Sequence, residues 1–208
     1  MRKVKSSYVG GHLHPDAPGS FPSLAVAILG HANKLLRSHL AEAGDDIILA
    51  VDLKGDRGCR SVVSWDANSK KTPEELLHRL ETLPLIAEKG LAKAAKDVSN
   101  AGILGTISIL MENSGKGALI ELASIPKPAE IELPDWLVCF QSFGFVLSVS
   151  AKNSEAVVSL FREREITATI IGKVIDEPMI TLRSGPESKV LFDFRKDKIT
   201  GIVYQPRN

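Results

Sequence analysis

The sequence has little cysteine and no long hydrophobic run. Its two cysteines, Cys59 and Cys139, are far apart in the chain, a spacing that fits neither a zinc module nor a disulfide scaffold. The longest purely aliphatic run, residues 24–29, is much too short to span a membrane. The opening residues, MRKVKSSYVGG, are charged but no apolar segment follows them. We therefore expect no secretory signal and a cytoplasmic protein.

The chain also lacks an excess of charge of either sign. Lysine and arginine number 26 and aspartate and glutamate 25, which gives a net charge of +1. This balance argues against a protein that coats nucleic acid or an anionic membrane, and we expect neither as a partner. The 44% of hydrophobic and 25% of charged residues are typical of a folded chain. At 208 residues we expect one large domain, or one domain with an appendage.

Alternating hydrophobic patterns predict a mixture of strands and helices. The predicted helices cover 73–95, 99–113 and 154–164, and Thr72 followed by Pro73 marks the start of the first. Pro84 is expected to kink or restart that helix. Short apolar runs predict strands at 24–29, 47–51, 118–122, 145–149, 169–175, 179–182 and 190–194. This order favours an α+β fold, with a mixed sheet packed with helices.

Two segments have loop composition. Residues 10–22 are rich in glycine and proline, and long loops of this kind are usually functional or linkers. Residues 54–71 carry turn formers and charges without a clean period. Because they offer few groups to bury, we expect this second segment to be mobile or gated by a ligand.

The segment KDVSNAGILG, residues 96–105, is the most informative for chemistry. Asp97 precedes an apolar-periodic helix, with Asn100 and two glycines following. In one interpretation Asp97 caps that helix and the glycines let another element pack closely. In the other, the carboxylate faces a cleft and holds Mg²⁺ bridged to phosphate, because Mg²⁺ prefers one or two carboxylates plus phosphate oxygens.

Two other segments carry candidate ligand groups. In VGGHLHPDAP, residues 9–18, paired glycines permit close approach of the backbone to a ligand, whereas the histidine spacing is a weak metal signal. In WDANS, residues 65–69, Asp66 and Asn68 either face a ligand or form an Asx-turn. The sequence contains no Walker A motif, no nucleophile elbow and no Rossmann glycine fingerprint.

Several of these segments together resemble one superfamily. VGGH followed by an aliphatic run is similar to the domain junction of the aminoimidazole ribonucleotide (AIR) synthase superfamily, which includes selenophosphate synthetase and thiamine-monophosphate kinase. KDVSNAG resembles the D-V-[ST]-x-x-G motif of this superfamily. FQSFGFVL at 140–147 resembles its P-Q-[TS]-x-G-G segment, and IIGKVI at 170–175 resembles its I-G-x-V strand. Within the group, GGHLHPDAP, WDANS and LFDFRKDKITGI resemble the archaeal proteins called methanogenesis marker protein 2.

The resemblance implies a fold, cofactors and partners. Residues 23–208 would form an AIR synthase-like C-terminal domain, and 1–22 would be the remnant of an interdomain strand and its glycine and proline loop. ATP and Mg²⁺ are the implied cofactors. An N-terminal ATP-binding half or second subunit is the implied partner, and a homo-oligomer is expected.

It also implies roles for single residues. Gly10, Gly11 and His12 would border the nucleotide, and Asp97 would bind Mg²⁺. Asp66, Asn68 and Asn100 are candidates for contact with substrate or phosphate. The catalytic residues are not identified.

We therefore expect the C-terminal domain of an ATP-dependent phosphoryl-transfer enzyme, inactive without its N-terminal half, because few groups are left here to surround a γ-phosphate. The alternative is a non-catalytic scaffold or ligand-sensing module that retains the fold.

Overall fold

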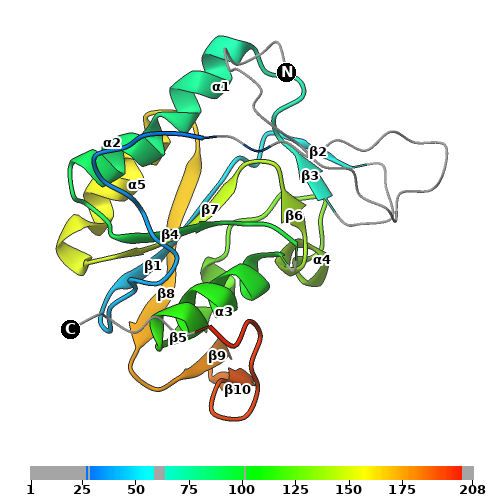
Figure 1. Ribbon diagram of the computed structural model, residues 1–208. Coiled ribbons are helices and arrows are strands. Elements are labelled where there is room, and N and C mark those ends of the chain that lie inside the picture. The colour runs from blue at the N-terminus through cyan, green and yellow to red at the C-terminus, as the bar shows by residue number, and fades with distance from the viewer. Residues whose placement is uncertain (1–26, 28, 59–63, 101, 203–208) are drawn as a thin grey trace. The chain divides into compact units, whose positions relative to one another are not determined.

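A computed structural model describes residues 27, 29–58, 64–100 and 102–202 (Figure 1). The chain divides into two units, 1–33 and 34–208, and the fold below belongs to the second. The predicted strand at 24–29 lies mostly outside the described residues, and its two described positions, 27 and 29, are not in a strand. None of the described helices is long and apolar enough to cross a bilayer.

The core of this unit is a seven-stranded mixed sheet in the order β10-β9-β5-β8-β1-β7-β4. Neighbouring strands are antiparallel except for the parallel pair β5 and β9. Its strands are β1 (Asp46–Val51), β4 (Ala94–Asp97), β5 (Gly117–Glu121), β7 (Gly144–Val149), β8 (Thr167–Ile175), β9 (Met179–Ser184) and β10 (Glu187–Asp193). A smaller sheet, β2-β3-β6, contains Asp56–Arg57, Ser64–Asp66 and Phe140–Gln141.

Helices cover both faces of the large sheet. All six residues of the central strand β1 are buried, which requires protein on either side of it. In Figure 1, α3 and α4 lie on one side and α1, α2 and α5 on the other. The helices are α1 (Pro73–Leu80), α2 (Thr82–Glu88), α3 (Gly102–Ser114), α4 (Leu133–Leu137) and α5 (Ser154–Arg162). The α+β prediction, a mixed sheet packed with helices, is confirmed.

The predicted helix at 73–95 is too long. The start at Thr72 is correct, because its hydroxyl and the Glu75 carboxylate form a reciprocal capping box. The helix breaks at Glu81, and Pro84 lies in the first turn of α2, where its missing N–H is tolerated. Gly90 then adopts a φ of +65° and ends α2, so residues 94–97 are free to form β4.

The predicted helix at 99–113 begins three residues later than expected. α3 starts at Gly102, whose φ is +65°. A Cβ at this position would lie 2.3 Å from the carbonyl oxygen of Leu137. The glycine therefore lets the segment after α4 pack directly on the start of α3, as the close-packing interpretation of KDVSNAG predicted.

Part of the segment 54–71, predicted to be mobile or gated by a ligand, packs into the core at Trp65 and Ala67. Trp65 in β3 is 2% exposed and meets Trp136 edge to face, with ring centroids 5.7 Å apart. Its Nε1 donates to the carbonyl oxygen of Asp52 at 2.9 Å. One buried tryptophan supplies enough apolar area to anchor a polar segment. Residues 59–63, with Cys59, lie outside the described part of the chain.

The C-terminal segment is held by a buried carboxylate on α3. Glu112, 3% exposed, accepts hydrogen bonds from the backbone N–H groups of Ile199 at 2.9 Å and Thr200 at 2.7 Å, and from the Thr200 hydroxyl at 2.6 Å. Burial alone would raise the pKa of Glu112, but these hydrogen bonds outweigh it and lower the pKa below its usual 4.5.

Gly102→Ala should strongly destabilise the protein. An alanine in the left-handed conformation lowers the free energy of unfolding by about 1–2 kcal/mol. The clash of its Cβ with Leu137 lowers it by about a further 1–3 kcal/mol. Gly44→Ala is the matched control, because Gly44 also has a positive φ but a Cβ there would meet open space. In urea unfolding, the free energy of unfolding should fall by about 1 kcal/mol more for Gly102→Ala than for Gly44→Ala, or by a larger amount still. Equal losses would show that close packing at Gly102 is unimportant.

Glu112→Gln should weaken the protein in a pH-dependent way. The folded-state pKa of Glu112 is lowered, so its contribution is present above the unfolded value near 4.5 and disappears as the pH falls through the folded value. At neutral pH we expect the free energy of unfolding to fall by about 1.5–3 kcal/mol, because the hydrogen bonds to Glu112 have a charged acceptor. The difference from the wild type should shrink in urea titrations below about pH 4.5. A difference in unfolding free energy that does not change with pH would show that the charge of Glu112 does not hold the C-terminal segment.

Candidate functional site

Two of the motif segments meet at one end of the large sheet. Asp97, the last residue of β4, is paired with Phe145 in β7. The N–H of Val98 donates to the carbonyl oxygen of Gly144 at 2.9 Å, and that of Gln141 to Val98 at 3.5 Å. The segments 96–102 and 140–147 therefore lie side by side, although more than thirty residues separate them in the chain.

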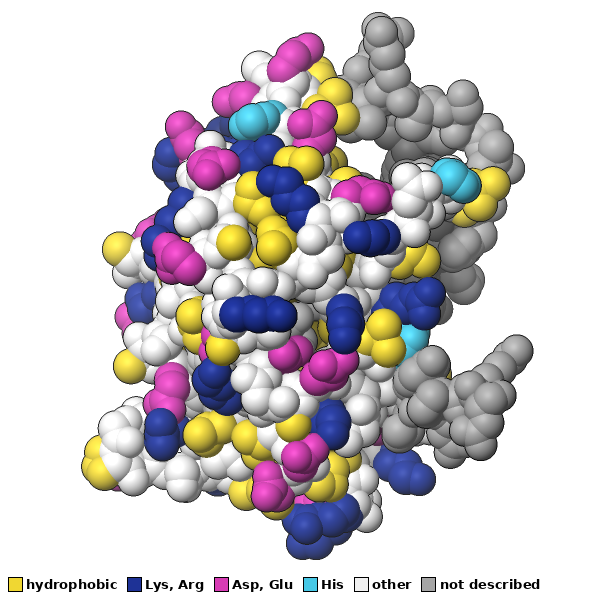
Figure 2. All heavy atoms as spheres, turned by 90° about the vertical axis from the view of Figure 1, so that its left-hand side faces the viewer, with side chains coloured by type: hydrophobic (Ala, Val, Ile, Leu, Met, Phe, Trp, Pro, Cys, Tyr) yellow, Lys and Arg dark blue, Asp and Glu magenta, His cyan; other side chains and the backbone are white. Residues whose placement is uncertain are grey.

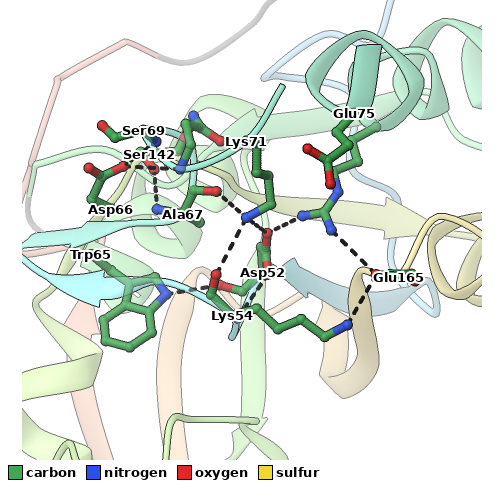
Figure 3. A network of polar contacts seen from close by, with 12 residues as sticks. Asp52, Lys54, Trp65, Asp66, Ala67, Ser69, Lys71, Glu75, Ser142 and Glu165 are labelled. Atoms are coloured by element: carbon green, nitrogen blue, oxygen red, sulfur yellow. Dashed lines mark hydrogen bonds and ion pairs between the residues drawn. The ribbon is translucent and has the colours of Figure 1, made fainter. Parts of the chain in front are cut away.

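The segment WDANS joins them through the small sheet. β3 runs parallel to β6, with Trp65 opposite Gln141. Ser142 then ties the loop down: its hydroxyl accepts from the Ala67 N–H at 2.8 Å, and its carbonyl oxygen accepts from Asn68 Nδ2 at 2.7 Å (Figure 3). The loop that holds Asp66 and Asn68, the loop that follows Asp97 and the loop at 141–144 are thus connected at one edge.

The side chain of Asp66 closes a local turn. Its Oδ1 accepts from the backbone N–H groups of Asn68 and Ser69, each at 3.0 Å. This is the Asx-turn that the sequence offered as one interpretation. A contact of Asp66 or Asn68 with substrate or phosphate stays a prediction.

Asp97 does not cap α3. It ends β4, and its carboxylate is 66% exposed, with Lys96 Nζ at 3.4 Å. The capping interpretation is therefore wrong, because Asp97 extends the ladder to β7 and α3 begins only at Gly102. Asn100 is exposed two residues before that helix.

The metal and nucleotide assignments stay predictions. The described residues contain no group of three or more histidine, cysteine, aspartate or glutamate side chains that would hold a metal by themselves. A single carboxylate with phosphate oxygens is a ligand set that Mg²⁺ accepts, and Mg²⁺ binding by Asp97 stays a prediction. Gly10, Gly11 and His12 lie outside the described residues.

Two amide side chains at this edge have buried atoms without a hydrogen-bond partner among the described residues. Gln141 is 4% exposed, and neither its Oε1 nor its Nε2 has a hydrogen-bond partner among the described residues; the same holds for Oδ1 of Asn68. A Cβ at Gly144 would lie 2.3 Å from Gln141 Oε1, so the glycine makes room for this amide. Buried polar atoms are rarely left unpaired. In the sequence, Gln141 lies within the segment FQSFGFVL and nothing along the chain distinguishes it as a site residue.

One buried aspartate connects the loops at 66–69 and 141–144 to the end of β1. Asp52 follows β1 and is 1% exposed. Its N–H donates to Phe143 at 3.4 Å, and its Oδ1 accepts from the Lys54 N–H at 2.9 Å. Its Oδ2 binds the Arg79 guanidinium of α1 and lies 2.8 Å from Lys71 Nζ (Figure 3).

The two cations on Asp52 have further partners. Lys71 Nζ also donates to the carbonyl oxygen of Ala67, which closes the turn containing Asn68. Arg79 Nη2 lies 3.7 Å from the Glu165 carboxylate, which in turn pairs with Lys54 Nζ at 3.0 Å. The network thus fixes α1 and the turn at 67–71 to the end of β1 (Figure 3).

Cys139, which lies in the described part of the chain, has an unreactive thiol. Cys139 is fully buried, and this burial raises the pKa of its thiol to about 11. The thiol is therefore protonated at neutral pH and a poor nucleophile.

Residues 38–185 match the family described as AIR synthase related protein, C-terminal domain. The chain belongs to this family. Among its relatives, an uncharacterized protein of Methanocaldococcus jannaschii is 38% identical over 203 residues, which cover 97% of this chain and 62% of the relative. One from Synechocystis sp. is 35% identical over 195 residues, covering 94% and 60%. The chain thus spans about three fifths of the length of these relatives.

A solved structure confirms the fold of this AIR synthase-related domain. PurL from Thermotoga maritima, complexed with ATP, superposes with a TM-score of 0.64 at 17% identity, over 85% of this chain and 30% of the other. The family match contains every described candidate residue, from Asp66 to Gln141. The strand β10 and the segment held by Glu112 follow the matched range.

Asp52→Asn should unfold or greatly weaken the domain. Among the described residues, the change leaves Lys71 without a carboxylate and leaves Arg79 with only the exposed Glu165 carboxylate, 3.7 Å from its Nη2. Removing one partner of a buried ion pair typically costs about 3–5 kcal/mol. Glu155→Gln is the control, because Glu155 pairs with Arg162 at 3.9 Å on the surface and its loss should change stability by less than about 0.5 kcal/mol. Urea titration of both variants measures the difference. A loss below about 1 kcal/mol for Asp52→Asn would contradict a central role of this carboxylate.

Proposed function

We propose that this chain is the C-terminal domain of an ATP-dependent phosphoryl-transfer enzyme. In this proposal the edge formed by the loops at 66–69, 97–100 and 141–144 contributes one side of a Mg²⁺–ATP site. The observation that carries the proposal is the convergence of three separated motif segments at that edge. A structural relative of the same fold that was solved with ATP supports it.

The rest of the site would come from another part of the protein or a second subunit. The curated relatives extend well beyond the matched region, which leaves room for an N-terminal ATP-binding half. Both polar atoms of the Gln141 amide and Oδ1 of Asn68 have no hydrogen-bond partner among the described residues, which supports the view that this edge is completed by a further group. Association of two copies through such a half, and a cytoplasmic location, are part of the same proposal.

Each residue has a defined task in this proposal. Asp97, exposed at the end of β4, would hold Mg²⁺, and Gly10, Gly11 and His12 would border the nucleotide. Asn68, Asp66 and Asn100 would orient substrate or phosphate through their side chains. Mg²⁺, when bound, would neutralise charge that develops on the transferred phosphoryl group. The narrower resemblance to methanogenesis marker protein 2 stays a prediction, and the substrate is left open.

Calorimetric titration with Mg²⁺–ATP tests the proposal. The chain alone should bind weakly, and the chain joined to its N-terminal half should bind well. Asp97→Ala should then lower the affinity at least tenfold, equivalent to about 1.4 kcal/mol. Asp176→Ala is the matched control, because Asp176 is equally an exposed carboxylate beside a lysine, 2.6 Å from Lys116 Nζ.

Three outcomes of this titration would each contradict a different part of the proposal. Equal affinity of the two variants would remove Asp97 from the metal site. Rapid ATP turnover by the chain alone would show that the site is complete without another half. Absence of ATP binding in every form would favour a non-catalytic scaffold or ligand sensor.

A further inference from the structure

A second hollow lies at the opposite end of β1 and β7 from the candidate phosphoryl-transfer site. It measures about 260 Å³ and is formed by the start of β1, the end of β7, the loop at 90–93 and the turn before α5. Figure 2 views this side of the molecule, where acidic and basic side chains are interspersed rather than gathered by sign. The volume is below the roughly 300–1,000 Å³ of pockets that hold drug-sized ligands, so it suits a small molecule.

The walls of this hollow are fixed by hydrogen bonds. The Asp45 carboxylate accepts from the Ser148 hydroxyl at 2.6 Å, and the backbone of Asp45 accepts from the Val174 N–H at 2.9 Å. On the other wall, Asn153 Nδ2 donates to the carbonyl oxygen of Leu91 at 3.1 Å and ties the loop to the start of α5. The lining groups are thus positioned before any ligand arrives.

Among the described residues, the hollow is lined by one group of each sign that forms no ion pair, although the charge of Asp45 also acts on the nearby Lys93. Lys93 Nζ and the Glu42 carboxylate pair with each other at 2.8 Å. Lys152 and Asp45 also line the hollow, and neither forms an ion pair within the part of the chain that the structure describes. The hollow therefore offers the ammonium of Lys152, the Ser150 hydroxyl and the carboxylate of Asp45. The Oδ2 of Asp45 already accepts from the Ser148 hydroxyl and from the Glu42 N–H at 3.4 Å.

We propose that this hollow binds a free α-amino acid. The ligand's carboxylate would meet Lys152 and its ammonium group would meet Asp45, so that both unpaired charges gain a partner. A simple anion or a simple cation would neutralise only one of them, and a nucleotide is too large for the volume. The site is separate from the proposed ATP site and does not depend on it.

Thermal unfolding of the 208-residue chain with each L-amino acid at millimolar concentration tests this proposal. At least one amino acid should raise the unfolding midpoint, whereas acetate and methylammonium, which carry one charge each, should not. Lys152→Gln and Asp45→Asn should each weaken binding at least tenfold. Lys89→Gln, an exposed lysine outside the hollow, and Asp97→Ala should leave it unchanged.

The two substitutions in the hollow are chosen so that a loss of binding is not caused by a loss of folding. The asparagine in Asp45→Asn retains an oxygen that can accept the Ser148 hydrogen bond, and Lys152 is exposed, so its substitution should not disturb the fold. The proposal is overturned if no amino acid shifts the midpoint, if acetate alone gives the same shift, or if the shift persists in Lys152→Gln.

Discussion

The fold around the candidate site depends on the buried carboxylate of Asp52. It receives the guanidinium of Arg79 and the ammonium of Lys71 in a place from which water is nearly excluded. A buried charge without partners is costly, so each of the three side chains requires the others. Because they come from the end of β1, from α1 and from the turn after β3, their pairing determines where those elements lie.

The same residue links stability to the geometry of the site. The backbone of Asp52 bonds to Phe143 and to the indole of Trp65, while Lys71 closes the turn that presents Asn68. The loops at 66–69 and 141–144 are therefore placed by the network and not by contacts with a ligand. Such preorganisation is what a site for phosphoryl transfer needs, because its catalysis relies mainly on positioning and charge.

Local pattern predicted much of the fold because aliphatic runs such as 47–51 and 145–149 are buried on both faces. The local pattern did not predict the structure where contacts with distant residues determine it. Residues 94–97 form a strand because they pair with β7, and Trp65 packs into the core together with the polar segment around it. The motif segments indicated Asp66, Asn68 and Asp97, which the fold brings to one edge. Asp52 and Gln141 were missed, since nothing in their neighbourhood along the chain shows that Arg79 or Gly144 will meet them.

The most direct test of the account follows backbone amide signals by NMR while Mg²⁺–ATP is added to the chain joined to the N-terminal half proposed for it. The largest changes should fall in the loops at 66–69, 97–100 and 141–144, and Asp97→Ala should abolish them. Changes confined to other parts of the domain, or no changes in these loops when nucleotide is bound, would contradict the claim that this edge forms one side of the nucleotide site.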